Sequence, residues 1–293
     1  MAIAPAHQFG QIIGEVLEAA VTPLLTEFAE QHELYLDKKG ERPCRVGKKC
    51  SWVDVNGNTH DLDYVLERGG TPSEKGMPAA FIETAWRRYT KHSRNKAQEI
   101  QGAIMPLIET YRNAAPFQGA ILAGEFTAGA LTQLRSLGFT VLYFPYETVI
   151  SVFKRFKIDA RFDEGTSDAD LKKKVNSLKG LSELRKRRLA RALLEANREG
   201  VATFITSLTA AVSRQIERIV VLPLNGIARD VSTIEEAIKF VENYAEGVMV
   251  EPFVRYEIQV RYNNGNLIEG TFGDKTSAID FLRTYQPALI EKG

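Results

Sequence analysis

Three short apolar segments, separated by amphipathic ones, limit this chain to few architectures. The apolar segments cover residues 79–86, 118–124 and 139–144. Each has the length and near-continuous hydrophobicity of a strand that is buried on both faces. Residues 93–113 and 127–137 have helical periodicity, and such strand–helix–strand connections bring successive strands parallel. We therefore predict an α/β fold with a mixed sheet core flanked by helices.

The segment before these strands supplies a helix and a hairpin. Apolar residues recur at helical spacing over residues 7–32. Residues 51–55 and 60–67 have the pattern of two strands, with an Asn-Gly-Asn turn at 56–58 between them. The predicted order is therefore helix, hairpin, strand, helix, strand, helix, strand.

The second half of the chain is less regular, and we find no internal repeat of useful length in the sequence. We expect an α/β core over residues 1–160 and an α+β C-terminal region over 161–293, with no composition change that fixes the boundary between them. The elements predicted for the C-terminal region are helices at 168–198, 202–218, 232–245 and 275–285, a strand at 219–224, and a hairpin of 253–262 with 267–272.

Charge and cysteine content exclude several classes of protein. The 293 residues carry 38 Lys+Arg against 37 Asp+Glu, so the chain is no polycation and any nucleic-acid contact must come from local basic patches. Two cysteines, Cys44 and Cys50, are too few for a secreted disulfide scaffold. No apolar run approaches the ~20 residues of a membrane span, and no signal peptide is recognisable. We expect a cytoplasmic protein without membrane contact.

Carboxylates beside apolar strands are the most informative chemical feature. Asp61 and Asp63 sit two residues apart on a predicted strand, and Glu83 lies inside the apolar segment 79–86. Buried carboxylates are costly unless a cation compensates them, and Mg²⁺ prefers oxygen ligands. The alternative is that these carboxylates pair with Arg87 or Arg88, or are simply surface residues at strand ends.

A basic segment follows Glu83 directly. Positive charge at the start of a helix opposes the helix dipole, which favours a functional reason for it, such as phosphate contact. The basic side chains are Arg87, Arg88, Lys91, His92, Arg94 and Lys96.

Asp63, then Glu83 in an apolar strand, then a basic helix resembles the PD-(D/E)XK nuclease superfamily, and more narrowly its type II restriction-endonuclease-like members. Residues 14–18 are similar to the G-x-x-x-E element of many such nucleases, and 118–144 resembles the closing strand–helix–strand. The resemblance covers about half of the chain. It implies hydrolysis of double-stranded DNA by a Mg²⁺-dependent enzyme, with Mn²⁺ as a possible substitute.

The resemblance also implies roles for single residues. Asp63 and Glu83 would bind the metal together with the Thr84 carbonyl, with Asp61 as the competing aspartate. The family's lysine two residues after the acid is replaced here by Ala85. Lys96, Lys91 or Arg87 would then supply the missing cation, and Glu99 would hold the lysine or bind metal. Glu18 would have an outer role.

Other features give weaker indications. Cys44, Cys50 and His60 lack the fourth ligand of a structural zinc site. The polar hairpin face with Arg255, Glu257, Gln259 and Arg261 suits base reading, dimerisation or simple exposure. A basic helix is equally compatible with DNA contact and with a solvated face; its charges are Arg185, Lys186, Arg187 and Arg188.

The sequence therefore predicts a restriction-type endodeoxyribonuclease that acts as a homodimer. Two alternatives remain at this point. One is a DNA-binding relative that has lost cleavage, which Ala85 would explain. The other is a nuclease for RNA or single strands.

Overall fold

The computed structural model describes residues 4–246 and 253–286. Two compact units make up the chain, Met1–Val212 and Ser213–Gly293. The first unit contains a five-stranded sheet, a two-stranded sheet and two apolar cores, and the second contains a four-stranded sheet and one apolar core.

The first unit is built on a five-stranded mixed sheet with the order β1-β4-β5-β6-β7. Neighbouring strands are antiparallel from β1 to β5 and parallel from β5 to β7. The predicted α/β class is therefore confirmed, including the parallel strands joined by helical crossovers. The strands are β1 (Leu34–Lys38), β4 (Tyr64–Arg68), β5 (Met77–Arg87), β6 (Phe117–Gly124) and β7 (Thr140–Pro145).

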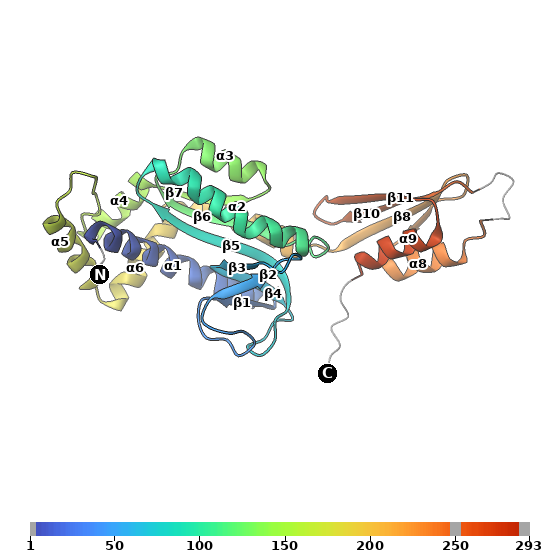
Figure 1. Ribbon diagram of the computed structural model, residues 1–293, viewed down its shortest axis with the longest axis horizontal. Coiled ribbons are helices and arrows are strands. Elements are labelled where there is room, and N and C mark those ends of the chain that lie inside the picture. The colour runs from blue at the N-terminus through green and yellow to red at the C-terminus, as the bar shows by residue number, and fades with distance from the viewer. Residues whose placement is uncertain (1–3, 247–252, 287–293) are drawn as a thin grey trace. The chain divides into compact units, whose positions relative to one another are not determined.

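Helices cover both faces of this sheet (Figure 1). On one face lies α1 (Pro5–Gln31), whose Phe9, Leu17 and Leu25 enter the same core as Ile82 of β5. On the other face lie α2 (Ser93–Thr110), after the 3₁₀ turn η1 (Thr90–His92), and α3 (Ala128–Ser136); they share a second core with the opposite side of the sheet. The alternation of β5 therefore sends successive side chains into two separate cores.

The predicted hairpin differs from the observed structure at Asp63. The sequence suggested one strand over residues 60–67, but the chain bends at Asp63 and forms two strands. The first, β3 (Thr59–Leu62), pairs only with β2 (Cys50–Val53), while β4 pairs with β1 and β5. The alternating pattern runs through the bend, so periodicity alone did not reveal it.

Three further helices belong to the first unit and not to a separate C-terminal region. They are α5 (Asp168–Lys179), α6 (Glu183–Glu195) and α7 (Arg198–Val212). Leu171, Leu189 and Phe204 bury their side chains in the α1 core. The division between units therefore falls after Val212, whereas the sequence suggested residue 160.

Local elements of this unit also differ from the prediction. The predicted helix 168–198 is interrupted around Gly180, because Ser182 caps a new helix through its hydroxyl. Both β1 and α4 (Tyr146–Arg155) were missed, and α7 ends before the predicted residue 218.

The second unit is an internal duplication of a hairpin followed by a helix. Its elements are β8 (Ile216–Pro223), β9 (Arg229–Val231), α8 (Ile234–Asn243), β10 (Tyr256–Tyr262), β11 (Leu267–Phe272) and α9 (Lys275–Thr284). The sheet order is β11-β10-β8-β9, so the first strand of one hairpin, β8, pairs with the first strand of the other, β10. The motif Ala-Ile-x-Phe-x₃-Tyr begins at Ala237 in one copy and at Ala278 in the other. The sequence analysis missed this repeat because few residues outside that motif match.

Candidate functional site

Asp63 and Glu83 meet where β4 begins to pair with β5. The first residue of β4, Tyr64, lies opposite Ile82. At the bend that precedes it, the Asp63 carboxylate accepts hydrogen bonds from the Thr84 amide (2.8 Å) and the Thr84 hydroxyl (2.7 Å). The Asp63 amide donates to Glu83 Oε1 (3.2 Å). The break in the strand thus lets two carboxylates twenty residues apart share one small region.

Glu83 is buried, and among the described residues its ionic partner is Lys96, at 3.7 Å. The exposure of Glu83 is 6%, and it lies in a strand that is mostly apolar. Burial, with the nearby charge of Asp63, raises the pKa of Glu83 to about 8, and the positive charge of Lys96 only partly opposes this. A carboxylate in this state favours either a proton or an additional cation.

Lys96 reaches Glu83 from the first turn of α2. Its Nζ lies 3.7 Å from Glu83 Oε2 and 3.6 Å from Glu99 Oε2. Arg87 approaches the same Glu99 oxygen at 3.6 Å. The lysine is therefore held between two carboxylates, on the side of the sheet that Ala85 also faces. The structure brings together Asp63, Glu83, Lys96 and Glu99 of the predicted set, with Arg87 at the edge.

Glu18 approaches this group from α1. Partial desolvation, followed by the charge of Asp63, raises the pKa of Glu18, while Lys39 lowers it. Glu18 therefore lies close enough to Asp63 to be affected by its charge, and the outer role of Glu18 stays a prediction.

Asp61 does not join the site. Its carboxylate accepts from Lys49 Nζ (2.5 Å) and the Ser51 hydroxyl (2.6 Å), and Lys49 lowers the pKa of Asp61. Asp61 belongs to the small β2–β3 sheet, whereas the chain has left that sheet at Asp63. The prediction that both aspartates lie on one strand face is therefore wrong, and Asp63 is the one beside Glu83.

Two of the predicted cations are engaged elsewhere. Lys91 pairs with Glu164 (2.8 Å) on the surface. The Arg88 guanidinium donates to the Phe162 carbonyl (2.5 Å) and stacks over Tyr146 at 4.2 Å from the ring centroid. Neither side chain contacts Glu83, so the alternative in which Arg88 neutralises the carboxylates is wrong.

The remaining basic residues lie on exposed surfaces. Arg94, Arg187 and Arg188 are exposed. Arg185 donates to the Phe156 carbonyl (2.8 Å), and Lys186 pairs with Glu183 within α6. The polar side chains expected on one face of the hairpin contact one another: Arg255 with Glu257, Gln259 with Glu269, and Arg261 with Gln259.

The donors at Asp63 and Glu83 match the chemistry of Mg²⁺. Within residues 4–246 and 253–286, no three His, Cys, Asp or Glu side chains form a metal-binding group. Mg²⁺ commonly uses one or two carboxylates and completes its shell with water and substrate phosphate. The Thr84 amide points to Asp63, and the amide and carbonyl of a strand residue face the same edge, so the Thr84 carbonyl faces the site as well. Two carboxylates and one carbonyl fit this ion.

Sequence reasoning missed how Asp63 is held. Only the Thr84 carbonyl was considered, whereas its hydroxyl and amide fix the aspartate. A threonine directly after a buried acid was the available signal. Cys50 is buried and Cys44 is partly buried, and both are free thiols; His60 pairs with Asp54 (2.9 Å).

Comparison with known proteins adds little. No protein-family model and no curated protein matches the chain. The crystal structure of a protein of unknown function, AF1548, aligns with 64% of this chain and 98% of its own at 11% identity and a TM-score of 0.28. A likeness this weak carries no argument. Among the described residues, no helix has the length and hydrophobicity needed to cross a membrane.

Proposed function

We propose that this protein is a Mg²⁺-dependent endonuclease of restriction type, which hydrolyses phosphodiester bonds of double-stranded DNA, has the PD-(D/E)XK arrangement, and acts as a homodimer in the cytoplasm. One observation carries the proposal. A buried carboxylate, a second carboxylate and a lysine converge from three separate elements, and the lysine, at 3.7 Å, only partly offsets the burial of Glu83.

The chain's own groups have distinct tasks in this proposal. Asp63 and Glu83 would hold Mg²⁺ together with the Thr84 carbonyl. When bound, Mg²⁺ supplies a Lewis acid and lowers the pKa of water. Thr84 keeps the Asp63 carboxylate in place through two hydrogen bonds.

Lys96 takes the role left open by Ala85. Its ammonium can stabilise the negative charge that develops on the scissile phosphate. Glu99 holds the lysine at 3.6 Å, where it also pairs with Glu83. Lys96, with 17% of its side chain exposed, is shielded enough for its charge to act strongly, yet accessible to a phosphate.

The test is cleavage of duplex DNA with Mg²⁺ under single-turnover conditions. Asp63→Asn, Glu83→Gln and Lys96→Ala should each slow cutting by about 10²-fold or more. The matched controls Asp61→Asn and Lys91→Ala should cut normally, because their side chains contact Lys49 and Glu164 instead.

Other outcomes distinguish the competing functions. Binding without cutting by the wild type would indicate a non-cleaving DNA-binding protein. Cutting of RNA or single strands, but not of duplex DNA, would indicate a nuclease for those substrates instead. Unchanged cutting by Glu83→Gln would overturn the site assignment.

A further inference from the structure

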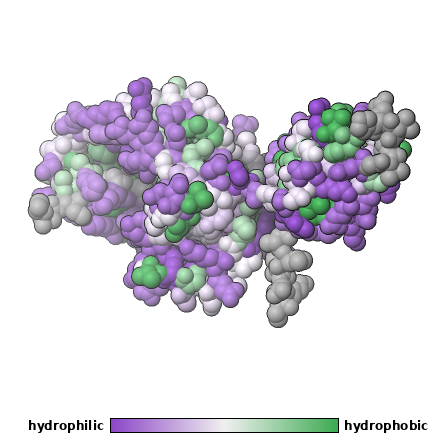
Figure 2. Space-filling view, turned by 45° about the vertical axis from the view of Figure 1, so that its right-hand side comes forward, coloured by the Kyte–Doolittle hydropathy of each residue, from purple (hydrophilic) through white to green (hydrophobic). Residues whose placement is uncertain are grey.

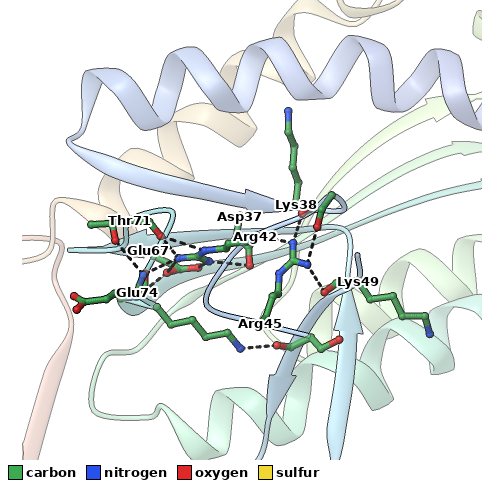
Figure 3. Close-up of polar contacts among 12 residues, drawn as sticks. Asp37, Lys38, Arg42, Arg45, Lys49, Glu67, Thr71 and Glu74 are labelled. Atoms are coloured by element: carbon green, nitrogen blue, oxygen red, sulfur yellow. Dashed lines mark hydrogen bonds and ion pairs between the residues drawn. The ribbon is translucent and has the colours of Figure 1, made fainter. Parts of the chain in front are cut away.

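The loop between β1 and β2, Gly40–Lys49, has a fixed shape although it contains no helix or strand. Two arginines of this loop point inward. Arg42 binds Glu67 with two hydrogen bonds (2.5 and 3.0 Å) and also donates to the carbonyls of Thr71 and Glu74. Figure 3 shows these contacts from the loop to β4 and to the segment after it. Arg42 thus ties the loop to two other parts of the first unit.

Arg45 organises the backbone of the loop itself. Its guanidinium donates to the carbonyls of Lys38 (2.7 Å), Gly40 (2.9 Å) and Lys49 (2.7 Å), and to Asp37 Oδ1 (3.0 Å). These carbonyls come from both ends of the loop (Figure 3). Its side chain is only 5% exposed. Burying two guanidinium groups is costly, and here the result is a surface loop with one defined conformation.

The outer side of the same loop combines lysines with one apolar residue. Val46 follows the buried Arg45 and is 99% exposed. Lys38, Lys39, Lys48 and Lys49, in and beside the loop, are exposed; Lys48 pairs with Glu41 at 3.2 Å and Lys49 with Asp61 at 2.5 Å. Figure 2 shows small hydrophobic spots within a largely hydrophilic surface on the first unit. A valine exposed on a rigid loop with lysines is suited to a partner whose surface is negatively charged and whose interior is apolar.

This loop borders the candidate site. Lys39 lies close enough to Glu18 to lower its pKa, and Glu18 in turn feels the charge of Asp63. At the other end of the loop, Lys49 pairs with Asp61, two residues before Asp63. A polymer bound at Asp63 and Glu83 would therefore extend over the loop.

We infer that Gly40–Lys49 is a preformed contact for duplex DNA. The lysines face phosphates, and Val46 enters a groove and presses against the base edges or between two base pairs. Apolar wedges of this kind unstack base steps when basic groups hold the backbone on either side. A lipid surface fits less well, because one valine offers too little apolar area for stable insertion. The inference rests on the proposed function, since it takes DNA as the substrate.

The test compares Val46→Ser with Val55→Ser. Val55 is 71% exposed in the turn after β2, so its replacement is a matched loss of an exposed valine. The full-length proteins are titrated into a fluorescein-labelled duplex of about 30 base pairs, and EDTA is present to prevent cleavage. Val46→Ser should weaken binding about tenfold, as expected for the loss of roughly 1.4 kcal/mol of apolar contact, whereas Val55→Ser should bind as the wild type does.

A second measurement tests the wedge directly. Duplexes with 2-aminopurine at successive positions should become more fluorescent on binding wild-type protein at one base step, and the increase should be lost with Val46→Ser. If wild type binds and cuts duplex DNA but the two serine variants are indistinguishable in both assays, this inference is overturned and the proposed function stands. If wild type binds no duplex, both are overturned. If Val46→Ser lost binding to anionic vesicles but bound duplex DNA as the wild type does, DNA would also be rejected as the partner of this loop.

Discussion

Two buried charge clusters on the same sheet differ in how completely their charges are paired. In the loop-anchoring cluster, Asp37 of β1 and Glu67 of β4 meet Arg42 at 2.9 and 2.5 Å, and Arg45 adds a further contact to Asp37. In the candidate site, Glu83 of β5 has one ionic partner among the described residues, Lys96 at 3.7 Å.

The difference separates a structural role from a chemical one. Burial alone would raise the pKa of Asp37, but hydrogen bonds from Arg45, Cys50 and Arg42 outweigh it and leave the pKa below its usual value. At Glu83, burial prevails and the pKa rises to about 8. A cluster whose charges form close ion pairs stabilises one conformation, whereas a carboxylate with a single, longer ion pair retains affinity for a cation.

Removal of Arg42 should have the largest effect on stability. Arg42→Met leaves Asp37 and Glu67 buried with reduced compensation, and we expect a loss of about 3–5 kcal/mol in the free energy of unfolding. Urea unfolding monitored by circular dichroism measures it. The control Arg191→Met removes an exposed pair with Glu195 and should cost no more than about 0.5 kcal/mol. If the two substitutions lowered the free energy of unfolding equally, the buried ion pairs of Arg42 would contribute no more than an exposed one.

Removal of the Glu83 charge should act in the opposite direction. The pKa is about 8 in the folded protein and 4.5 for an ordinary glutamate, so the folded state binds the proton more tightly. This contribution to stability is complete below about pH 4.5 and is lost as the pH rises through about 8. In EDTA at pH 9, Glu83→Gln should therefore be more stable than wild type by about 2–4 kcal/mol.

The same experiment supplies its own check. The difference between Glu83→Gln and wild type should shrink steadily from pH 9 to pH 5, since wild-type Glu83 takes up its proton over that range. Glu109→Gln, which alters an exposed glutamate paired with Arg112, should show no such trend. A pH-independent difference for Glu83→Gln would mean that its charge is already compensated.

Mg²⁺ should stabilise the candidate site but not the paired cluster. At a concentration of about 100 Kd, a bound ion adds about 2.7 kcal/mol to the free energy of unfolding. Thermal unfolding with and without MgCl₂ measures this independently of activity. Asp61→Asn should keep the increase, because Asp61 pairs with Lys49, and Asp63→Asn should lose it. An increase retained in Asp63→Asn would place the ion elsewhere.

The same contrast explains what the sequence could and could not predict. Apolar segments with helical connections were enough for the mixed sheet, because each was long and uniform. A glutamate inside such a segment indicated Glu83, and helical spacing put Lys96 and Glu99 on one face of α2. The structural contacts agree with that spacing, while the catalytic roles remain predictions.

Features that depend on tertiary pairing could not be predicted. Residues 40–49 look like an ordinary polar loop, and nothing local distinguishes the inward-facing Arg42 and Arg45 from the exposed lysines beside them. The alternation of apolar and polar residues continues through Asp63 in the sequence, but the strand breaks there because β3 pairs with β2 and β4 pairs with β5. The duplicated second unit retains its pattern of elements with few shared residues, so its similarity was recognisable in three dimensions first.

Lys96 should have the smallest effect on stability and the most specific one on the site. Its positive charge opposes the rise in the pKa of Glu83. Lys96→Met removes that charge and keeps much of the apolar length, so the pKa of Glu83 should rise further, by about one unit or roughly 1.4 kcal/mol. Carboxyl-carbon NMR titration of Glu83 in EDTA measures the shift. Lys91→Met is the matched control, because Lys91 pairs with Glu164 and should leave Glu83 unchanged.

If both substitutions leave the titration of Glu83 as it is in the wild type, Lys96 does not act on this carboxylate, and its contact at 3.7 Å is too weak to complete the site. If only Lys96→Met shifts it, the lysine is coupled to the buried acid before any substrate binds, which is the arrangement that a cation poised for phosphate requires.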